Sequence, residues 1–115
     1  MFSPVIFREY DIRGVYETDF DLDFAKSLGK AFVSFHNKKT GKTNPKLVIG
    51  NDARLSSPAI VNALAEGMSE AGAQVFKIGL VTTAMTYFTT FFYDFVDGAI
   101  MVTGSHNPPD YNGFK

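Results

Sequence analysis

Hydrophobic positions along the chain alternate between short continuous runs and stripes with helical spacing. Residues 47–49 form a continuous apolar run closed by a glycine, which is typical of a strand buried on both faces of a parallel sheet. Residues 74–78 and 99–102 predict two further strands. A fourth, short apolar run at residues 5–7 is followed by the polar segment 8–14, which predicts a strand and then a loop.

Between these runs, apolar residues recur at spacings of three and four, which is the pattern of amphipathic helices. The first predicted helix covers residues 21–37, with the aspartates at 19 and 21 as candidate N-caps. The second begins with Ser57 as the N-cap and Pro58 in its first turn, and Gly72 is placed to end it in the left-handed conformation. The third is rich in aromatic residues and covers residues 84–95.

Two segments around these helices have simple interpretations. Phe88, Phe91, Phe92 and Phe95 share helical spacing, so we expect them to form an aromatic core face rather than a ligand site. Residues 36–45 are rich in Lys, Gly, Thr and Asn, which predicts an exposed loop.

The alternation of strands and helices predicts an α/β fold: a mainly parallel or mixed sheet of about four strands, with helices on both faces. A chain of 115 residues that is 45% hydrophobic is large enough for one core, so we expect one domain over residues 1–115. In such sheets, ligands bind just beyond the carboxyl ends of the strands. Three polar or glycine-containing segments are predicted there: 50–57, 79–83 and 103–115.

Composition excludes several classes of function. The net charge of −1 comes from 11 basic and 12 acidic residues that are scattered along the chain, so no field would attract nucleic acid or an anionic membrane. The absence of cysteine excludes disulfides and thiolate metal sites. The first residues are interrupted by Pro4 and by charges, and no stretch approaches the roughly 20 apolar residues that span a bilayer. We therefore expect a soluble, cytoplasmic protein.

The densest candidate chemistry lies in residues 103–115. Gly104 lets the backbone turn sharply beside Ser105, and two prolines stiffen the far side, so we expect Ser105 at a loop apex. A hydroxyl that accepts and returns a phosphoryl group needs cationic or donor groups around it. Candidates in the same segment are His106, Asn107 and Lys115. From composition alone, a simple glycine- and proline-rich turn with no catalytic role is about as well supported as a phosphoryl site.

The segment reads Thr-Gly-Ser-His-Asn-Pro-Pro-Asp-Tyr-Asn-Gly-Phe-Lys and resembles the phosphoserine loop of the α-D-phosphohexomutase family, usually Thr-Ala-Ser-His-Asn-Pro followed by Tyr-Asn-Gly and a lysine. Residues 7–14, Phe-Arg-Glu-Tyr-Asp-Ile-Arg-Gly, resemble the first signature of that family. Residues 50–57, Gly-Asn-Asp-Ala-Arg-Leu-Ser-Ser, resemble its second signature. The sequence of residues 10–14, Tyr-Asp-Ile-Arg-Gly, is more similar to that of bacterial phosphomannomutase/phosphoglucomutase than to that of phosphoglucosamine mutase.

The chain departs from the family pattern at two positions. Gly104 stands where many members have alanine, and this change is expected to be mild. Thr83 stands where the family has proline, and its loss is expected to loosen the loop after Gly79.

The resemblance implies a phosphotransfer reaction. Phospho-Ser105 would give its phosphoryl group to a mannose or glucose phosphate, the resulting bisphosphate would reorient, and the other phosphate would return to the serine. Phosphate would thereby move between C6 and C1, with glucose 1,6-bisphosphate as activator. By matching position, Lys115 and Arg13 would assist proton transfer and charge stabilisation, His106 would line the phosphoryl site, Tyr10 and Asn107 would contact substrate, and Asp52 and Arg54 would orient the Ser105 loop.

The resemblance also implies further parts. Mg²⁺ would bridge a phosphoserine oxygen on Ser105 to an Asp-x-Asp-x-Asp loop that this chain lacks. Because the family enzyme has four domains, we expect the chain to be its N-terminal domain, to need the other domains as partners and to have no turnover alone. Apolar surface left exposed would favour self-association.

Other functions remain as alternatives. A non-catalytic phosphosugar or anion-binding module could use the same loop. A P-loop at Gly41-Lys-Thr fails because His36 stands where the motif needs glycine. A Ser105–His106 hydrolase pair is disfavoured because no Gly-x-Ser-x-Gly turn surrounds the serine. His36 has no partner at metal-ligand spacing and is left out of the site.

Overall fold

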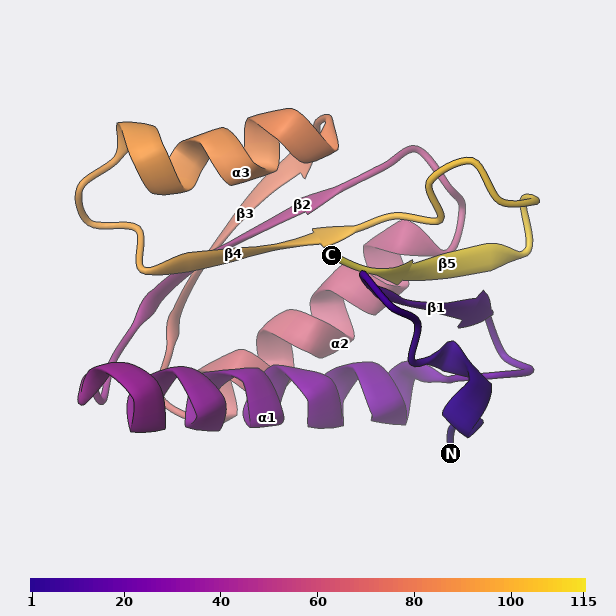
Figure 1. Ribbon diagram of the computed structural model, residues 1–115. Helices are drawn as coiled ribbons and strands as arrows, with labels where there is room; N and C mark the ends of the chain where they lie inside the picture. Colours follow the sequence, from indigo (N-terminus) through magenta and orange to yellow (C-terminus); the bar gives the residue numbers. More distant parts are fainter.

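The computed structural model describes all of residues 1–115 and has a five-stranded mixed sheet at its centre, in the order β1-β5-β4-β2-β3 (Figure 1). β2, β3 and β4 are parallel, whereas β5 runs antiparallel to both β4 and β1. The elements are a short 3₁₀ helix at Pro4–Ile6, β1 (Ile12–Val15), α1 (Leu22–Thr40), β2 (Lys46–Asn51), α2 (Ser57–Glu70), β3 (Gln74–Leu80), α3 (Thr83–Phe92), β4 (Gly98–Val102) and β5 (Tyr111–Phe114). The predicted α/β class is confirmed, although the sheet has five strands rather than about four.

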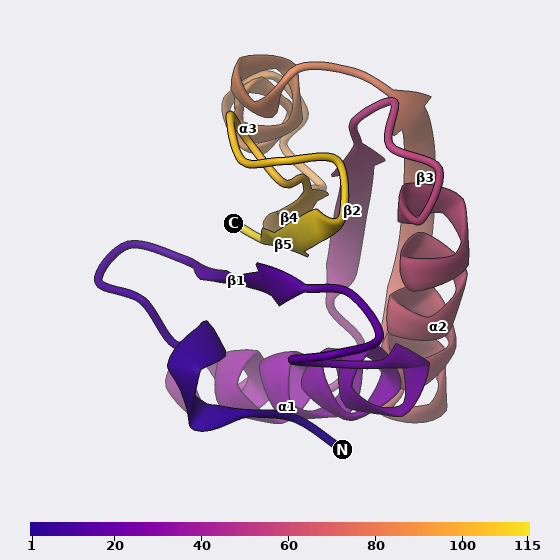
Figure 2. The ribbon, with the colours of Figure 1, turned by 90° about the vertical axis from the view of Figure 1, so that its right-hand side faces the viewer.

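Helices cover both faces of the sheet, as predicted. Seen along the sheet edge, α1 and α2 lie on one side and α3 lies on the other (Figure 2). The main core lies beneath α1 and α2, where apolar residues of β2 and β4 meet both helices: Leu47, Ile49, Ile100, Val102, Phe24, Val33, Ile60 and Leu64. Because side chains alternate along a strand, Val48 and Met101 are buried on the opposite face, under α3.

α1 and α2 pack with their backbones in direct contact. A Cβ atom at Gly29 would lie 2.4 Å from the carbonyl oxygen of Leu64, and one at Gly67 would lie 1.9 Å from that of Lys26. Glycine on both helices therefore permits the close crossing. At the rim of this contact, the Lys26 ammonium pairs with Glu66 and Glu70, each at 2.7 Å.

The prediction of the first strand is wrong in position. Residues 5–7 do not form a strand; instead Pro4, whose ring fixes φ near the helical value, opens the 3₁₀ helix. The strand lies at Ile12–Val15, partly within the expected loop, and β5 lies within the expected loop 103–115. β1 and β5 form because they pair with each other. This pairing joins residues that are far apart in the sequence, so the local pattern of neither segment indicates it.

The three helices are confirmed, with shifted ends. Asp21 caps α1 by accepting the Phe24 N–H at 2.9 Å, but the helix continues to Thr40 and so takes up half of the expected 36–45 loop. α2 begins at Ser57, with Ser56 rather than Ser57 in the N-cap position. Gly72 adopts the predicted left-handed conformation, with φ of +101°.

The aromatic residues of the third helix do not form a core face, and that prediction is wrong. Phe88, Phe91, Phe92 and Phe95 are 46–83% exposed, while the buried residues of α3 are Thr86 and Thr89. The reason is the short distance between α3 and the sheet. A Cβ atom at Gly50 of β2 would lie 2.1 Å from Thr86 Oγ1, so only a small side chain fits there.

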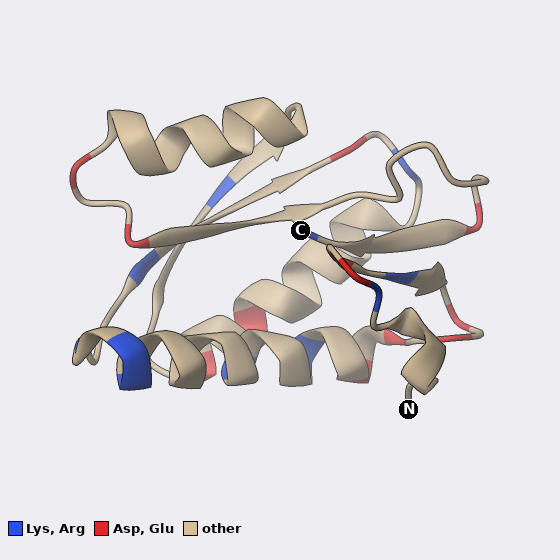
Figure 3. Ribbon diagram, in the orientation of Figure 1, with Lys and Arg blue, Asp and Glu red and all other residues tan.

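Charged residues are mixed over the molecule, and Figure 3 shows Lys and Arg interspersed with Asp and Glu rather than gathered into one field. Measured against the thickness of a bilayer, each of the helices is either too short or too polar to span it.

Candidate functional site

Ser105 lies at the exposed tip of the loop that joins β4 to β5, just beyond the carboxyl end of β4. Its φ of +53° puts it in the left-handed region, which among non-glycine residues only Glu17 shares. A serine in that region costs about 1 kcal/mol or more and persists only where the surroundings hold it. The backbone strain therefore falls on the residue that the sequence marks as the phosphoryl carrier.

Arg54 holds this loop in place. Its guanidinium reaches from the turn after β2 and donates hydrogen bonds to four backbone carbonyls of one loop. The acceptors are Ser105 at 3.0 Å, Asn107 at 2.8 Å, Pro108 at 2.5 Å and Tyr111 at 3.0 Å. A rigid planar donor that binds four carbonyls fixes the path of the backbone from the serine to the start of β5. Arg54 thus contacts the loop that contains Ser105, and its role in a reaction stays a prediction.

Asp52 organises the other side of the loop. One carboxylate oxygen accepts from the Ser57 hydroxyl and the Arg54 N–H, at 2.6 and 3.1 Å. The second oxygen accepts from the Thr103 hydroxyl, the Gly104 N–H and Arg54 Nε, at 2.8, 3.0 and 3.1 Å. Burial alone would raise the pKa of the Asp52 carboxyl, but the hydrogen bonds from Ser57, Thr103 and the two amides outweigh it, so the pKa is lowered. Asp52 is therefore held as the charged carboxylate.

Asn112 completes the support, although the sequence reasoning did not single it out. Its side chain is fully buried and donates to the hydroxyls of Ser56 and Ser57, at 2.8 and 2.9 Å. Its carbonyl oxygen accepts the Gly113 N–H at 2.9 Å. The serine pair of the second motif and the Asn-Gly pair of the third are thus bonded to each other. The presence of the serine pair in one motif and of the Asn-Gly pair in another was the sequence signal that could have pointed to Asn112.

The first motif contacts the other end of β5. Residues 8–11 form a tight turn closed by the Arg8 N–H, which donates to the Asp11 carbonyl at 2.9 Å. The Asp11 carboxylate accepts from Lys115 Nζ at 2.5 Å and lies 3.3 Å from Arg13 Nε. Asp11 was absent from the candidates and is the residue that brings Arg13 and Lys115 together.

The remaining candidates differ in their surroundings. Tyr10 is 88% exposed at the tip of its turn, and His106 is exposed next to Ser105. Asn107 uses its side-chain amide within the loop, donating to the Gly104 carbonyl at 2.9 Å. The candidate residues thus form two clusters. One is the Ser105 loop held by Arg54 and Asp52, and the other is the pair of cations Arg13 and Lys115 at the opposite end of β5.

The two departures from the family pattern have structural counterparts. A Cβ atom at Gly104 would lie 2.3 Å from Arg54 Cζ, so alanine there would require the guanidinium to move. At the other position, Thr83 is the first residue of α3. Thr82, just before it, caps the helix by accepting the Met85 N–H at 3.1 Å, so the helix has a defined start without proline.

The residues of this chain do not by themselves make a magnesium site. No three side chains among His, Cys, Asp and Glu gather as a cation would need. The most suitable carboxylates, Asp52 and Asp11, are already occupied by hydrogen-bond donors and cations.

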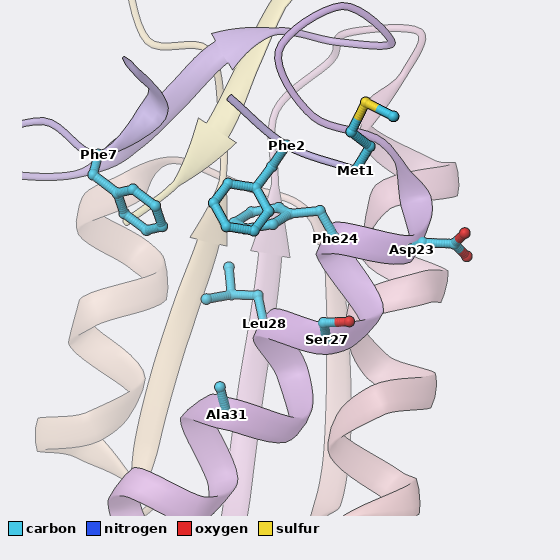
Figure 4. Close-up of a pocket in the computed structure, with 8 residues that line it drawn as sticks. All are labelled: Met1, Phe2, Phe7, Asp23, Phe24, Ser27, Leu28 and Ala31. Atoms are coloured by element: carbon cyan, nitrogen blue, oxygen red, sulfur yellow. The ribbon is translucent and has the colours of Figure 1, made fainter. Parts of the chain in front are cut away.

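Two hollows on the surface differ in their position relative to the candidate site. A shallow one beside the Ser105 loop is lined by Asp52, Ala53, Arg54, Asn107 and Pro109. The largest hollow lies elsewhere, between the N-terminal segment and α1 (Figure 4). It is mainly apolar, with the rings of Phe2 and Phe24 5.0 Å apart, and the carboxylate of Asp23 points away from the rings. It contains none of the candidate site residues.

Comparison with known proteins places the chain in a family. The family model described as "Phosphoglucomutase/phosphomannomutase, alpha/beta/alpha domain I" matches residues 4–115. A phosphomannomutase of Vibrio cholerae is 43% identical over 109 residues, which are 95% of this chain and 23% of that protein. A phosphomannomutase/phosphoglucomutase of Pseudomonas aeruginosa is 41% identical over 110 residues, which are 96% of this chain and 23% of that protein.

A solved structure shows the same fold. The crystal structure of a phosphoglucomutase/phosphomannomutase family protein from Burkholderia thailandensis superposes with a TM-score of 0.89 at 45% identity, covering 100% of this chain and 26% of that one. The chain is thus an α/β domain with three family motifs in its loops and in the strands next to them. It belongs to the phosphoglucomutase/phosphomannomutase family, which confirms the resemblance, and it spans about a quarter of the length of these relatives.

Proposed function

We propose that residues 1–115 act as the N-terminal domain of a longer cytoplasmic hexose phosphate mutase, in which Ser105 carries the phosphoryl group. One observation carries this proposal: the exposed serine has a strained backbone and is held there by Arg54 and Asp52. A loop ordered in this way presents a hydroxyl in a fixed position at low reorganisation cost, which phosphoryl transfer requires. The names of the relatives support the substrate class.

In the proposed reaction, a hydroxyl oxygen of the hexose monophosphate attacks the phosphorus of phospho-Ser105. A new P–O bond forms to the sugar, the bond to Ser105 Oγ breaks, and the proton of the sugar hydroxyl is released. The bisphosphate then reorients, and Ser105 Oγ takes up the other phosphoryl group in the reverse exchange. The net result moves phosphate between C6 and C1 of mannose or glucose phosphate. Glucose 1,6-bisphosphate would load the serine by the same second step.

Within this reaction, Lys115 and Arg13 would supply positive charge and assist proton transfer, while His106, Asn107 and Tyr10 would contact the phosphoryl group or the sugar. Magnesium enters the proposal only as a partner of the Ser105 phosphate, because no three His, Cys, Asp or Glu side chains of this chain gather to hold the ion. The remaining ligands and the sugar-binding groups would come from the other domains of the enzyme.

The test uses the full-length enzyme, incubated with glucose 1,6-bisphosphate and analysed by intact mass and phosphosite mapping. We expect one phosphate, on Ser105, and interconversion of the 1- and 6-phosphates of glucose or mannose. Ser105→Ala should lose turnover by several orders of magnitude, whereas Ser69→Ala, at an exposed position of α2, should not change it. Phosphate on another residue, or normal turnover in Ser105→Ala, would refute the proposal.

A second candidate function is a non-catalytic phosphosugar or anion-binding module. The observation that favours it is the shallow hollow beside the Ser105 loop, which is lined by Arg54 and Asn107 among others. Saturable binding of hexose phosphate by the full-length protein, without turnover and without phosphate on Ser105, would select this function. The isolated 115-residue chain should show no turnover under either function.

A further inference from the structure

We propose that Asp11 is a positioning residue, which holds the Lys115 ammonium and the Arg13 guanidinium beside each other for the reaction. This inference rests on the proposed function, because it assigns a role to the cations of that site. Asp11 touches neither the serine loop nor the space beside it, and it would act through its two cationic neighbours.

The contacts of Asp11 carry the inference. Its side chain is only 5% exposed, and Oδ2 accepts from Lys115 Nζ at 2.5 Å. Oδ1 lies 3.3 Å from Arg13 Nε and makes no hydrogen bond. Both oxygens of a nearly buried carboxylate therefore face cations. A carboxylate that is nearly buried needs partners of opposite charge, and removing one of them is costly.

The strand pairing explains why these three residues meet. β1 and β5 are antiparallel, with Ile12 opposite Phe114 and Arg13 opposite Gly113. One step outward in the same register, Asp11 faces Lys115, although the two are 104 positions apart in the sequence. Gly113 permits this close pairing, since a Cβ atom there would lie 2.2 Å from the Ile12 carbonyl oxygen. The pairing of β1 with β5 therefore places the Asp11 carboxylate next to the Lys115 ammonium.

The physical effect of Asp11 is to order two flexible cations. Lysine and arginine side chains have large rotamer freedom, which is lost when they act on a substrate. Two cations brought close together also repel each other. A carboxylate between them offsets that repulsion and selects one arrangement before the substrate binds. Loss of the carboxylate should therefore lower kcat more than it raises KM.

The experiment compares Asp11→Asn, Lys115→Gln and the double variant in the full-length enzyme. We expect Asp11→Asn to lower kcat at least tenfold with less than a threefold change in KM, and Asp11→Glu to restore part of the loss. The double variant should be less impaired than the product of the two single losses, because part of the effect of Asp11 acts through Lys115. Asp23→Asn, an exposed aspartate on α1, is the matched control and should behave as wild type.

A second measurement does not depend on turnover. Labelling of Lys115 by an amine reagent, measured by mass spectrometry, should increase at least threefold in Asp11→Asn and remain unchanged in Asp23→Asn. Wild-type kcat in Asp11→Asn, or losses that multiply in the double variant, would overturn the inference while the proposed function stands. A full-length protein without turnover whose Lys115 labelling still rises in Asp11→Asn would overturn the proposed function and leave the pairing intact.

Discussion

Asp52 joins the turn after β2 to the Ser105 loop through five hydrogen bonds, and all of them are made to a charged carboxylate. Because its pKa is lowered in the folded chain, the charged form contributes stability at neutral pH. That contribution is complete above the ordinary aspartate pKa of about 4 and is lost as the pH falls through the lower folded value.

Asp52→Asn should therefore lower the free energy of unfolding of the chain by about 1.5–3 kcal/mol at pH 7, the value typical of hydrogen bonds to a charged group. At pH 3 or below, the difference between the variant and wild type should be smaller. Urea unfolding at both pH values measures it. Asp110→Asn, at an exposed position of the same loop, is the control. An equal difference at both pH values would contradict the role given to the carboxylate.

Ser105 itself should show the cost of its left-handed backbone. Glycine adopts φ of +53° without penalty, whereas alanine has the same Cβ strain as serine. Ser105→Gly should therefore be more stable than Ser105→Ala by about 1 kcal/mol. Urea unfolding of the two variants, side by side, measures the difference. Equal stabilities would show that the backbone at residue 105 relaxes freely.

At the scale of elements, the α1–α2 contact sets two effects against each other. Helix propensity alone predicts that Gly67→Ala stabilises α2 by about 1 kcal/mol. The structure predicts the reverse, because the added Cβ would lie 1.9 Å from the Lys26 carbonyl, a backbone atom that cannot rotate away. Separating the helices typically costs about 1–3 kcal/mol, and at this distance the upper part of that range applies.

We therefore expect Gly67→Ala to lower the unfolding free energy by about 2 kcal/mol net, as measured by urea or thermal unfolding. Ser69→Ala, two residues further on the exposed side of the same helix, should change it by less than about 0.5 kcal/mol. A variant at Gly67 that is as stable as wild type would mean that the helices can move apart without loss of packing.

α3 shows why the hydrophobic pattern alone misplaced a helix face. Its phenylalanines have the spacing of a buried stripe, yet the helix turns its threonines toward the sheet, since Gly50 and Met101 leave room only for small side chains. Periodicity indicates that a helix has two different faces. Which face packs inward depended on the shape of the sheet beneath it.

At the scale of the whole molecule, the outward face of α3 leaves aromatic surface in contact with water. Phe88 and Phe92 are more than half exposed, and their rings lie next to each other, tilted by 31° and with centroids 5.4 Å apart. An apolar patch of this kind favours association. We expect the 115-residue chain to associate as its concentration rises, and the Phe88→Gln/Phe92→Gln variant to do so less.

Light scattering over a concentration series measures this. Phe35→Gln, which removes a similarly exposed phenylalanine from α1 on the other side of the sheet, should leave the association unchanged. A wild-type chain that stays monomeric at every concentration would contradict the prediction.

Much of the site was predictable because its residues lie in three short motifs, and short motifs are read locally. The placement of Ser105 at a loop tip followed from the glycine and prolines around it, and the role of Arg54 as loop support followed from the second motif. Asp11 was missed, because its significance depends on Lys115, which lies at the far end of the chain.

The sequence by itself determined the alternation of strands and helices, the N-cap at Asp21, the left-handed glycine at Gly72 and the motifs that identify the family. These features depend on hydrogen bonds and periodicities within a few residues of each other. Only the tertiary structure decided that residues 12–15 and 111–114 are strands, that α3 turns its threonines inward, and that Asp11 joins Arg13 to Lys115. Each of these features depends on contacts with a segment that is distant in the sequence, and a local sequence pattern does not identify that segment.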